Sequence, residues 1–129
     1  MQLATLFTDW NTAWNHDLGW ALVLVGIAWG AVLGLGFQRA DFLGGYDSFP
    51  RRLLRLGHVA CIALGGANVL WSVVAPVRDA AGWGGVAWAV GALCMPTVCA
   101  LSAWNPRFRH AFPIPVLAVV AGALNGLLS

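Results

Sequence analysis

Four apolar blocks, each long enough to cross a lipid bilayer as a helix, dominate this sequence of 129 residues. They cover residues 18–37, 56–75, 82–104 and 111–128, and more polar segments separate them. A transmembrane α-helix needs about 20 mainly apolar residues, because each residue advances only about 1.5 Å along the axis. The sequence therefore predicts an all-α, polytopic membrane protein, in which a bundle of four transmembrane helices forms a single domain over residues 1–129.

The composition is that of a membrane protein rather than a soluble one. Hydrophobic residues make up 60% of the chain and charged residues 9%, whereas soluble domains average about 45–50% and about 25%. Arginine and aspartate supply every charge, since the sequence contains neither Lys nor Glu. So few charges exclude a soluble enzyme, a secreted disulfide scaffold and a nucleic-acid binder, and membrane lipid is the expected surrounding.

The arginines gather on one side of the predicted helices and indicate the orientation of the chain. Loops on the cytoplasmic side of a membrane are enriched in Lys and Arg. Only Arg78 lies on the other side, and we therefore expect a bacterial inner-membrane protein with both termini outside, in the periplasm. The remaining arginines follow the first and third blocks: Arg39, Arg51, Arg52, Arg55, Arg107 and Arg109.

The segment before the first block, residues 1–16, has its apolar side chains at helical spacing. These side chains repeat along one helical face, which is typical of a helix lying at a membrane surface. We therefore expect a short interfacial helix over residues 1–16, separate from the first span. The apolar face consists of Leu3, Leu6, Phe7, Trp10 and Trp14.

Small residues recur every four positions in three of the predicted helices. In lipid, helices associate through close packing, and small residues allow two backbones to approach. These faces predict close packing of the helices within a bundle. A second interpretation, compatible with the first, is that one of these faces docks against another subunit. The residues assigned to packing are Gly26, Gly30 and Gly34 in the first span, Gly57, Gly65 and Asn68 in the second, and Gly122 and Gly126 in the fourth.

Polar residues of the second span follow a single helical seam that includes His58, Cys61 and Asn68. Polar groups inside a membrane usually point into the bundle and find hydrogen-bond partners there. Counted inward from the helix ends, His58 and Cys61 lie at depths similar to those of Met95 and Cys99 in the third span. Two interpretations are open: a structural polar seam, or a soft ligand set for Cu(I) or a haem iron.

A second candidate site lies where the second span begins. Arg51, Arg52 and Arg55 precede His58 by one or two helical turns. Arginines at this depth interact with anionic headgroups, so a lipid-headgroup or quinone pocket is the third interpretation.

Catalysis and coupled transport lack the residues that they require. All five Asp lie in loops or at the ends of spans, whereas cation-coupled transport usually needs an acidic group within the membrane. No serine of the spans has a base at its depth, as hydrolysis would require. We expect a small non-catalytic protein, an accessory subunit of a larger membrane complex or a homo-oligomer. The alternatives are haem or copper binding by His58, Met95 and Cys99, and lipid or quinone binding near Arg52, Arg55 and His58.

Overall fold

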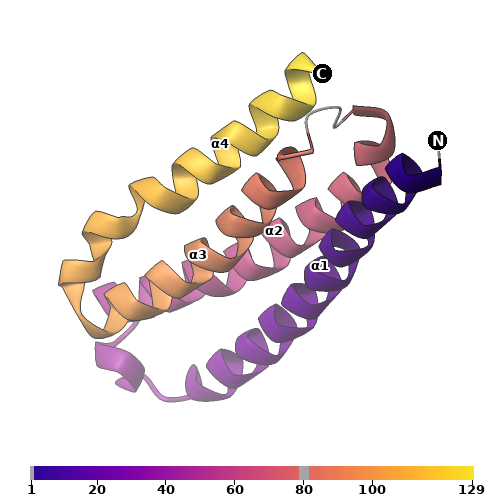
Figure 1. Cartoon of the computed structure of the whole chain (residues 1–129). Coiled ribbons are helices and arrows are strands. Elements are labelled where there is room, and N and C mark those ends of the chain that lie inside the picture. The colour runs from indigo at the N-terminus through magenta and orange to yellow at the C-terminus, as the bar shows by residue number, and fades with distance from the viewer. Residues whose placement is uncertain (1, 79–81) are drawn as a thin grey trace.

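The computed structural model describes the backbone of residues 2–78 and 82–129 and the side chains of residues 13–76 and 82–129. In these parts the chain is all-helical and contains no strand. Two short 3-10 helices, Phe42–Gly44 and Pro106–Ala111, lie in the connections. The four α-helices are α1 (Gln2–Gly36), α2 (Phe49–Arg78), α3 (Gly84–Trp104) and α4 (Pro113–Leu128) (Figure 1).

Among the described residues, four helical segments are long and apolar enough to cross a membrane. They agree in number and order with the predicted blocks, although their boundaries differ by several residues. The largest difference is at α2, which begins at Phe49 rather than Leu56. The segments are Ala13–Gly36, Phe49–Pro76, Gly84–Trp104 and Pro106–Leu128.

The early start of α2 has a local cause at Ser48. The Ser48 hydroxyl oxygen accepts a hydrogen bond from the backbone N–H of Arg51 at 3.4 Å and donates one to the carbonyl of Leu43 at 2.6 Å. A serine that accepts from the third residue of a helix is an N-cap, and proline is well tolerated in the first turn. Pro50 therefore lies inside α2, in its first turn.

The connection between α1 and α2 turns at Gly44 and Gly45. Their φ angles are +87° and +96°, which lie in the region where a side chain is disfavoured. This pair of glycines therefore allows the chain to turn between the two helices.

The prediction of a separate interfacial helix over residues 1–16 is wrong, because α1 is continuous from Gln2 to Gly36. The segment before the first span contains no proline and no glycine pair, which are the usual causes of a sharp kink. At about 1.5 Å per residue, the 35 residues of α1 extend about 52 Å, well beyond a hydrocarbon core of about 30 Å. The side chains predicted to form the apolar face at Leu3, Leu6, Phe7 and Trp10 lie outside the described residues.

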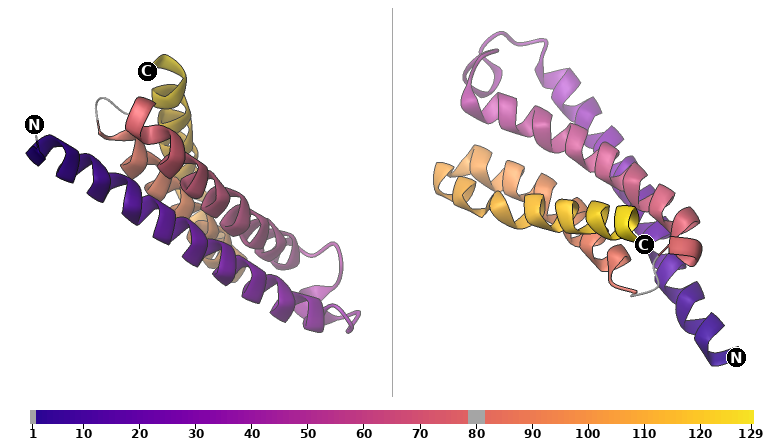
Figure 2. Two further views of the ribbon diagram at one scale, coloured as in Figure 1. Left: turned by 90° about the vertical axis from the view of Figure 1, so that its right-hand side faces the viewer. Right: turned by 90° about the horizontal axis from the view of Figure 1, so that it is seen from above.

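The helices pack in chain order, α1 on α2, α2 on α3 and α3 on α4. Helices α1 and α4 make no extended contact and form the two outer flanks of the molecule (Figures 1 and 2). The array is therefore open. The α1–α2 and α3–α4 connections lie at one end, called here the arginine end, and Gln2 and Ser129 lie toward the other, called the terminal end.

Candidate functional site

His58, the centre of the predicted metal or haem site, faces α1. Its Nδ1 donates a hydrogen bond to the backbone carbonyl of Gly26 at 2.7 Å. The ring lies flat against Gly30, where a Cβ would stand 2.3 Å from Cε1 and 2.8 Å from Nε2. The imidazole therefore acts as a packing and hydrogen-bonding group between α1 and α2.

The other predicted ligands point in different directions. The thiol of Cys61 donates to the carbonyl of Leu22 on α1 at 3.3 Å. Cys99 is fully buried beside Gly57 of α2, and Met95 is half-buried on α3. Within the described part of the chain, no group of three or more His, Cys, Asp or Glu side chains could hold a metal ion. Haem or copper binding stays a prediction to which these contacts add no support.

The predicted headgroup site contains one buried arginine. Arg51 is only 5% exposed, and its guanidinium carbon lies 4.3 Å from the centre of the Phe37 ring and 5.4 Å from that of Tyr46. Arg55 contacts the same Tyr46 ring at 5.4 Å, and Arg52 is exposed. The Arg51 Nε has no hydrogen-bond partner among the described residues. The three cations therefore lie in the first two turns of α2, and the described neighbours of Arg51 and Arg55 are aromatic rings rather than carboxylates.

Most of the glycines assigned to packing lie against another helix. Among these glycines the closest approach to the backbone of another helix is at Gly65, where a Cβ would stand 2.8 Å from the backbone oxygen of Gly19 on α1. Gly34 differs from the others, because nothing lies within 4 Å of its Cβ position. The remaining contacts are of Gly26 with Ile62, Gly30 with His58, Gly57 with Trp29 and Cys99, Gly122 with Trp88, and Gly126 with Trp71.

A buried polar cluster lies nearer the terminal end and links all four helices. We call it the asparagine–tryptophan cluster; its members are Asn15 of α1, Asn68 and Trp71 of α2, Trp88 of α3 and Asn125 of α4.

Asn68 is the centre of the hydrogen bonds in this cluster. Its Oδ1 accepts from Asn15 Nδ2 at 2.7 Å, and its Nδ2 donates to the carbonyls of Leu64 at 2.9 Å and Trp88 at 3.2 Å. Asn15 Nδ2 also donates to the carbonyl of Gly85 at 3.0 Å. Asn15 and Asn68 are both fully buried. These bonds join α1, α2 and α3 at one level of the molecule.

Four polar atoms of the cluster are buried without a hydrogen-bond partner in the described structure. Two are acceptors, the side-chain oxygens of Asn15 and Asn125, and two are donors, the indole N–H groups of Trp71 and Trp88. The two indole rings are neighbours, with centroids 6.4 Å apart. A buried polar atom without a partner costs about 1–3 kcal/mol, so four in one region call for an explanation.

Glycines bring these unpartnered atoms together. A Cβ at Gly84 would stand 2.4 Å from Trp71 Cζ2 and 2.6 Å from Asn125 Oδ1. A Cβ at Gly85 would stand 2.4 Å from Asn15 Oδ1 and 3.5 Å from Trp71 Nε1. The Trp71 ring therefore lies between the two amide oxygens, and only glycine at positions 84 and 85 leaves room for this arrangement.

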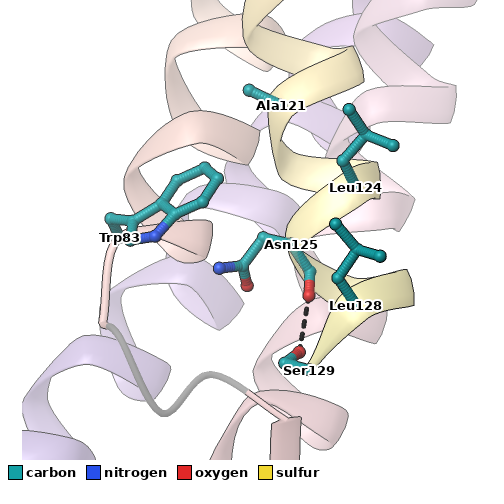
Figure 3. Close-up of a pocket in the computed structure, with 6 residues that line it drawn as sticks. All are labelled: Trp83, Ala121, Leu124, Asn125, Leu128 and Ser129. Carbon is teal, nitrogen blue, oxygen red and sulfur yellow. Dashed lines mark hydrogen bonds between the residues drawn. The ribbon is translucent and has the colours of Figure 1, made fainter.

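A pocket of about 390 Å³ adjoins the cluster, between the start of α3 and the end of α4. Figure 3 shows Asn125 pointing across it toward Trp83. Apart from Asn125 and the exposed Ser129, which donates to the Asn125 backbone carbonyl, the lining is apolar. The lining residues are Trp83, Ala121, Leu124, Asn125, Leu128 and Ser129.

Sequence reasoning missed most of this cluster. Asn68 was placed on the polar seam, but Asn15 was assigned to an interfacial helix. The available signal was an asparagine near the same end of each of three helices, namely Asn15, Asn68 and Asn125. A depth count like that used for His58 would have placed them at one level.

The cluster offers neutral hydrogen-bond donors and acceptors and contains neither an ionisable side chain nor a nucleophile. It is suited to binding or to fixing helices, and not to acid–base or nucleophilic chemistry. Comparisons with models of protein families, with curated proteins and with solved structures find no match for this chain.

Proposed function

We propose that this chain is an integral membrane protein that spans a bilayer four times and acts as a non-catalytic subunit of a larger assembly. The partners are other membrane proteins or further copies of the chain. Large apolar side chains on α1 support the membrane setting, since Leu24, Val32 and Leu35 are 65%, 66% and 72% exposed. Lipid or protein must cover side chains of this kind.

We also propose that the arginine end faces the cytoplasm and that both termini face outward from a bacterial inner membrane. The support is the distribution of charge: Arg39, Arg51, Arg52 and Arg55 follow α1, and Arg107 and Arg109 follow α3. Both connections lie at the same end of the molecule (Figure 1). Cytoplasmic loops are enriched in such cations.

The open arrangement of the helices is the observation that carries the assembly proposal. Helices α1 and α4 leave their outer faces without a protein neighbour, and Gly34 on α1 has empty space where its Cβ would be. Gly30 and Gly26, one and two turns earlier on α1, contact α2. A small residue in an exposed membrane helix allows another backbone to approach, so we assign the surface around Gly34 to a neighbouring subunit.

Sedimentation of the purified protein in a mild detergent tests this assignment. We expect the wild-type chain to sediment as an assembly larger than its own 13.7 kDa. Gly34→Leu should dissociate that assembly, because the added side chain fills the space available to the second backbone.

The control is Gly66→Leu, because Gly66 on α2 also has nothing within 4 Å of its Cβ position. The control variant should sediment like the wild type. An assembly that survives Gly34→Leu, or that only Gly66→Leu disrupts, would contradict the assignment to α1.

A second candidate function, binding of a phospholipid headgroup at the start of α2, is favoured by the buried Arg51. Three arginines in the first two turns place positive charge where the helix dipole favours anions, and the first turn contains no acidic residue. A lipid phosphate would pair with these cations and accept hydrogen bonds from the guanidinium groups.

Retention of phosphatidylglycerol, measured by native mass spectrometry, tests the second function. Arg51→Gln should weaken retention about fivefold, which corresponds to about 1 kcal/mol for one cation near a membrane surface. Arg107→Gln is the matched control, because Arg107 is exposed at the same end. Equal losses in the two variants would show only general attraction to anionic lipid and would count against a site at Arg51.

A further inference from the structure

The four unpartnered atoms of the asparagine–tryptophan cluster define the chemistry of a ligand. The amide oxygens of Asn15 and Asn125 require a donor, and the indole N–H groups of Trp71 and Trp88 require an acceptor. Asn15, Trp71 and Asn125 are each more than nine-tenths buried, so bulk solvent does not supply these partners. A guest that satisfies both kinds of atom must both donate and accept hydrogen bonds.

The guest must also be neutral. A metal cation or an ammonium group cannot accept from an indole N–H, and a carboxylate or phosphate cannot donate to an amide oxygen. The cluster contains no charged side chain that could compensate a buried ion, which would be costly without one. A hydroxyl group meets both requirements, since it donates one hydrogen bond and accepts up to two.

The adjoining pocket defines the rest of the ligand. Asn125 belongs both to the cluster and to the pocket wall (Figure 3). Trp83, Leu124 and Leu128, which also line the pocket, are 45%, 48% and 81% exposed. In a bilayer this apolar rim faces acyl chains, so a ligand can enter from the lipid with its polar end toward Asn125.

We infer that the asparagine–tryptophan cluster and its pocket bind a neutral lipid through a free hydroxyl group. The hydroxyl donates to the Asn125 oxygen and accepts from the indole N–H of Trp71, whose ring lies behind the pocket wall and beside that oxygen at Gly84. The hydrocarbon chain lies over Leu124 and Leu128. This inference rests on the proposal that the chain spans a membrane, but it does not depend on association with other subunits.

Binding of two matched lipids by the purified protein in detergent micelles tests the inference. Oleyl alcohol has a free hydroxyl, whereas oleyl methyl ether has the same chain and an ether oxygen that can accept but not donate. We expect the wild type to bind the alcohol about tenfold more tightly, because the ether leaves a buried amide oxygen without a donor. Native mass spectrometry gives the bound fraction of each lipid.

Variants locate the preference. Asn125→Leu replaces the amide by an apolar group with the same branching and the same number of heavy atoms. Trp71→Phe keeps an aromatic ring but removes the indole N–H. Both should reduce the preference for the alcohol to less than about twofold. Thr97→Val is the control, because Thr97 lies outside the cluster and this pocket and its hydroxyl bonds to the Leu93 carbonyl of its own helix. This variant should keep the preference of the wild type.

Equal binding of alcohol and ether by the wild type would overturn the inference and would indicate that ordered water satisfies the cluster. A folded Trp71→Phe variant that still prefers the alcohol to the ether as strongly as the wild type does would overturn it as well. This outcome is decisive even if Asn125→Leu does not fold. The assay measures lipid retention and not the mass of the assembly. A negative result therefore leaves the subunit proposal intact, and a monomeric protein could still bind the alcohol.

Discussion

At the scale of single residues, Asn68 joins three helices through its side chain. Its side chain bonds to Asn15 of α1 and to the Trp88 carbonyl of α3, and it is fully buried. In lipid the hydrophobic effect does not distinguish a helix from its surroundings, so polar contacts of this kind carry more of the specificity of packing.

Asn68→Leu should therefore lower the free energy of unfolding by about 1–2 kcal/mol, because Asn15 and the Trp88 carbonyl each lose a partner. The control is Thr97→Val, which removes an exposed hydroxyl bonded to Leu93 within the same helix. It should cost less than about 0.5 kcal/mol. Thermal unfolding in detergent, followed by circular dichroism, measures both changes, and equal stability of the two variants would contradict this role of Asn68.

Gly30 and Gly34 allow the same substitution to be compared one turn apart on α1. Gly30→Leu should destabilise the fold by about 1–3 kcal/mol, because the new side chain would collide with the His58 ring. Gly34→Leu meets open space and should unfold at nearly the wild-type temperature. Similar unfolding temperatures for the two variants, measured in the same detergent, would show that Gly30 is not part of a close helix contact.

At the scale of helices, the apolar pattern of the sequence predicts which helices exist and their order along the chain. It predicts less well the residues at which each helix begins and ends. The four spans were evident from the sequence, because a run of about 20 consecutive apolar residues has few possible structures other than a transmembrane helix. The ends depend on local contacts: α2 begins early because Ser48 caps it, and α1 includes residues 2–16 because nothing there breaks a helix. The segment before the first span has the composition of an interfacial helix, but composition alone does not indicate where an axis bends.

The cap of α2 gives a prediction at this scale. Ser48→Ala removes an acceptor for the Arg51 N–H and a donor to the Leu43 carbonyl, and should cost about 0.5–2 kcal/mol. Amide hydrogen exchange should become faster in the first turn of α2 and remain unchanged in α3. Ser72→Ala, in the middle of α2, is the control, because Ser72 bonds only to Val69 of its own helix. An unchanged exchange rate at Arg51 would contradict the cap.

At the scale of the whole molecule, the sites show what a single sequence can and cannot reveal. The arginines were found because they are adjacent in the chain and their chemistry is local. The asparagine–tryptophan cluster was missed because it requires knowing which helices are neighbours and how each is rotated. The same uncertainty placed His58, Cys61, Met95 and Cys99 in one site, whereas His58 and Cys61 face α1 and Cys99 lies beside α2.

The orientation proposal gives a further prediction. A reporter enzyme that is active only outside the cytoplasm, fused after Ser129, should be active, and the same reporter inserted after Asp47 should be inactive. The first position lies at the terminal end and the second at the arginine end. The reverse pattern of activity would place the arginines outside and contradict the proposed orientation.

The central claim is that this chain spans the membrane and works in an assembly. The most direct test is to measure, in native lipid, how many protein chains of each kind accompany one copy of it. Polymer-bounded discs cut from the membrane and analysed by native mass spectrometry would report every protein that surrounds one tagged chain. We predict a constant stoichiometry, with further copies of the 13.7 kDa chain or a second membrane protein in each disc. Discs that contain a single copy and no other protein in constant ratio would contradict the claim.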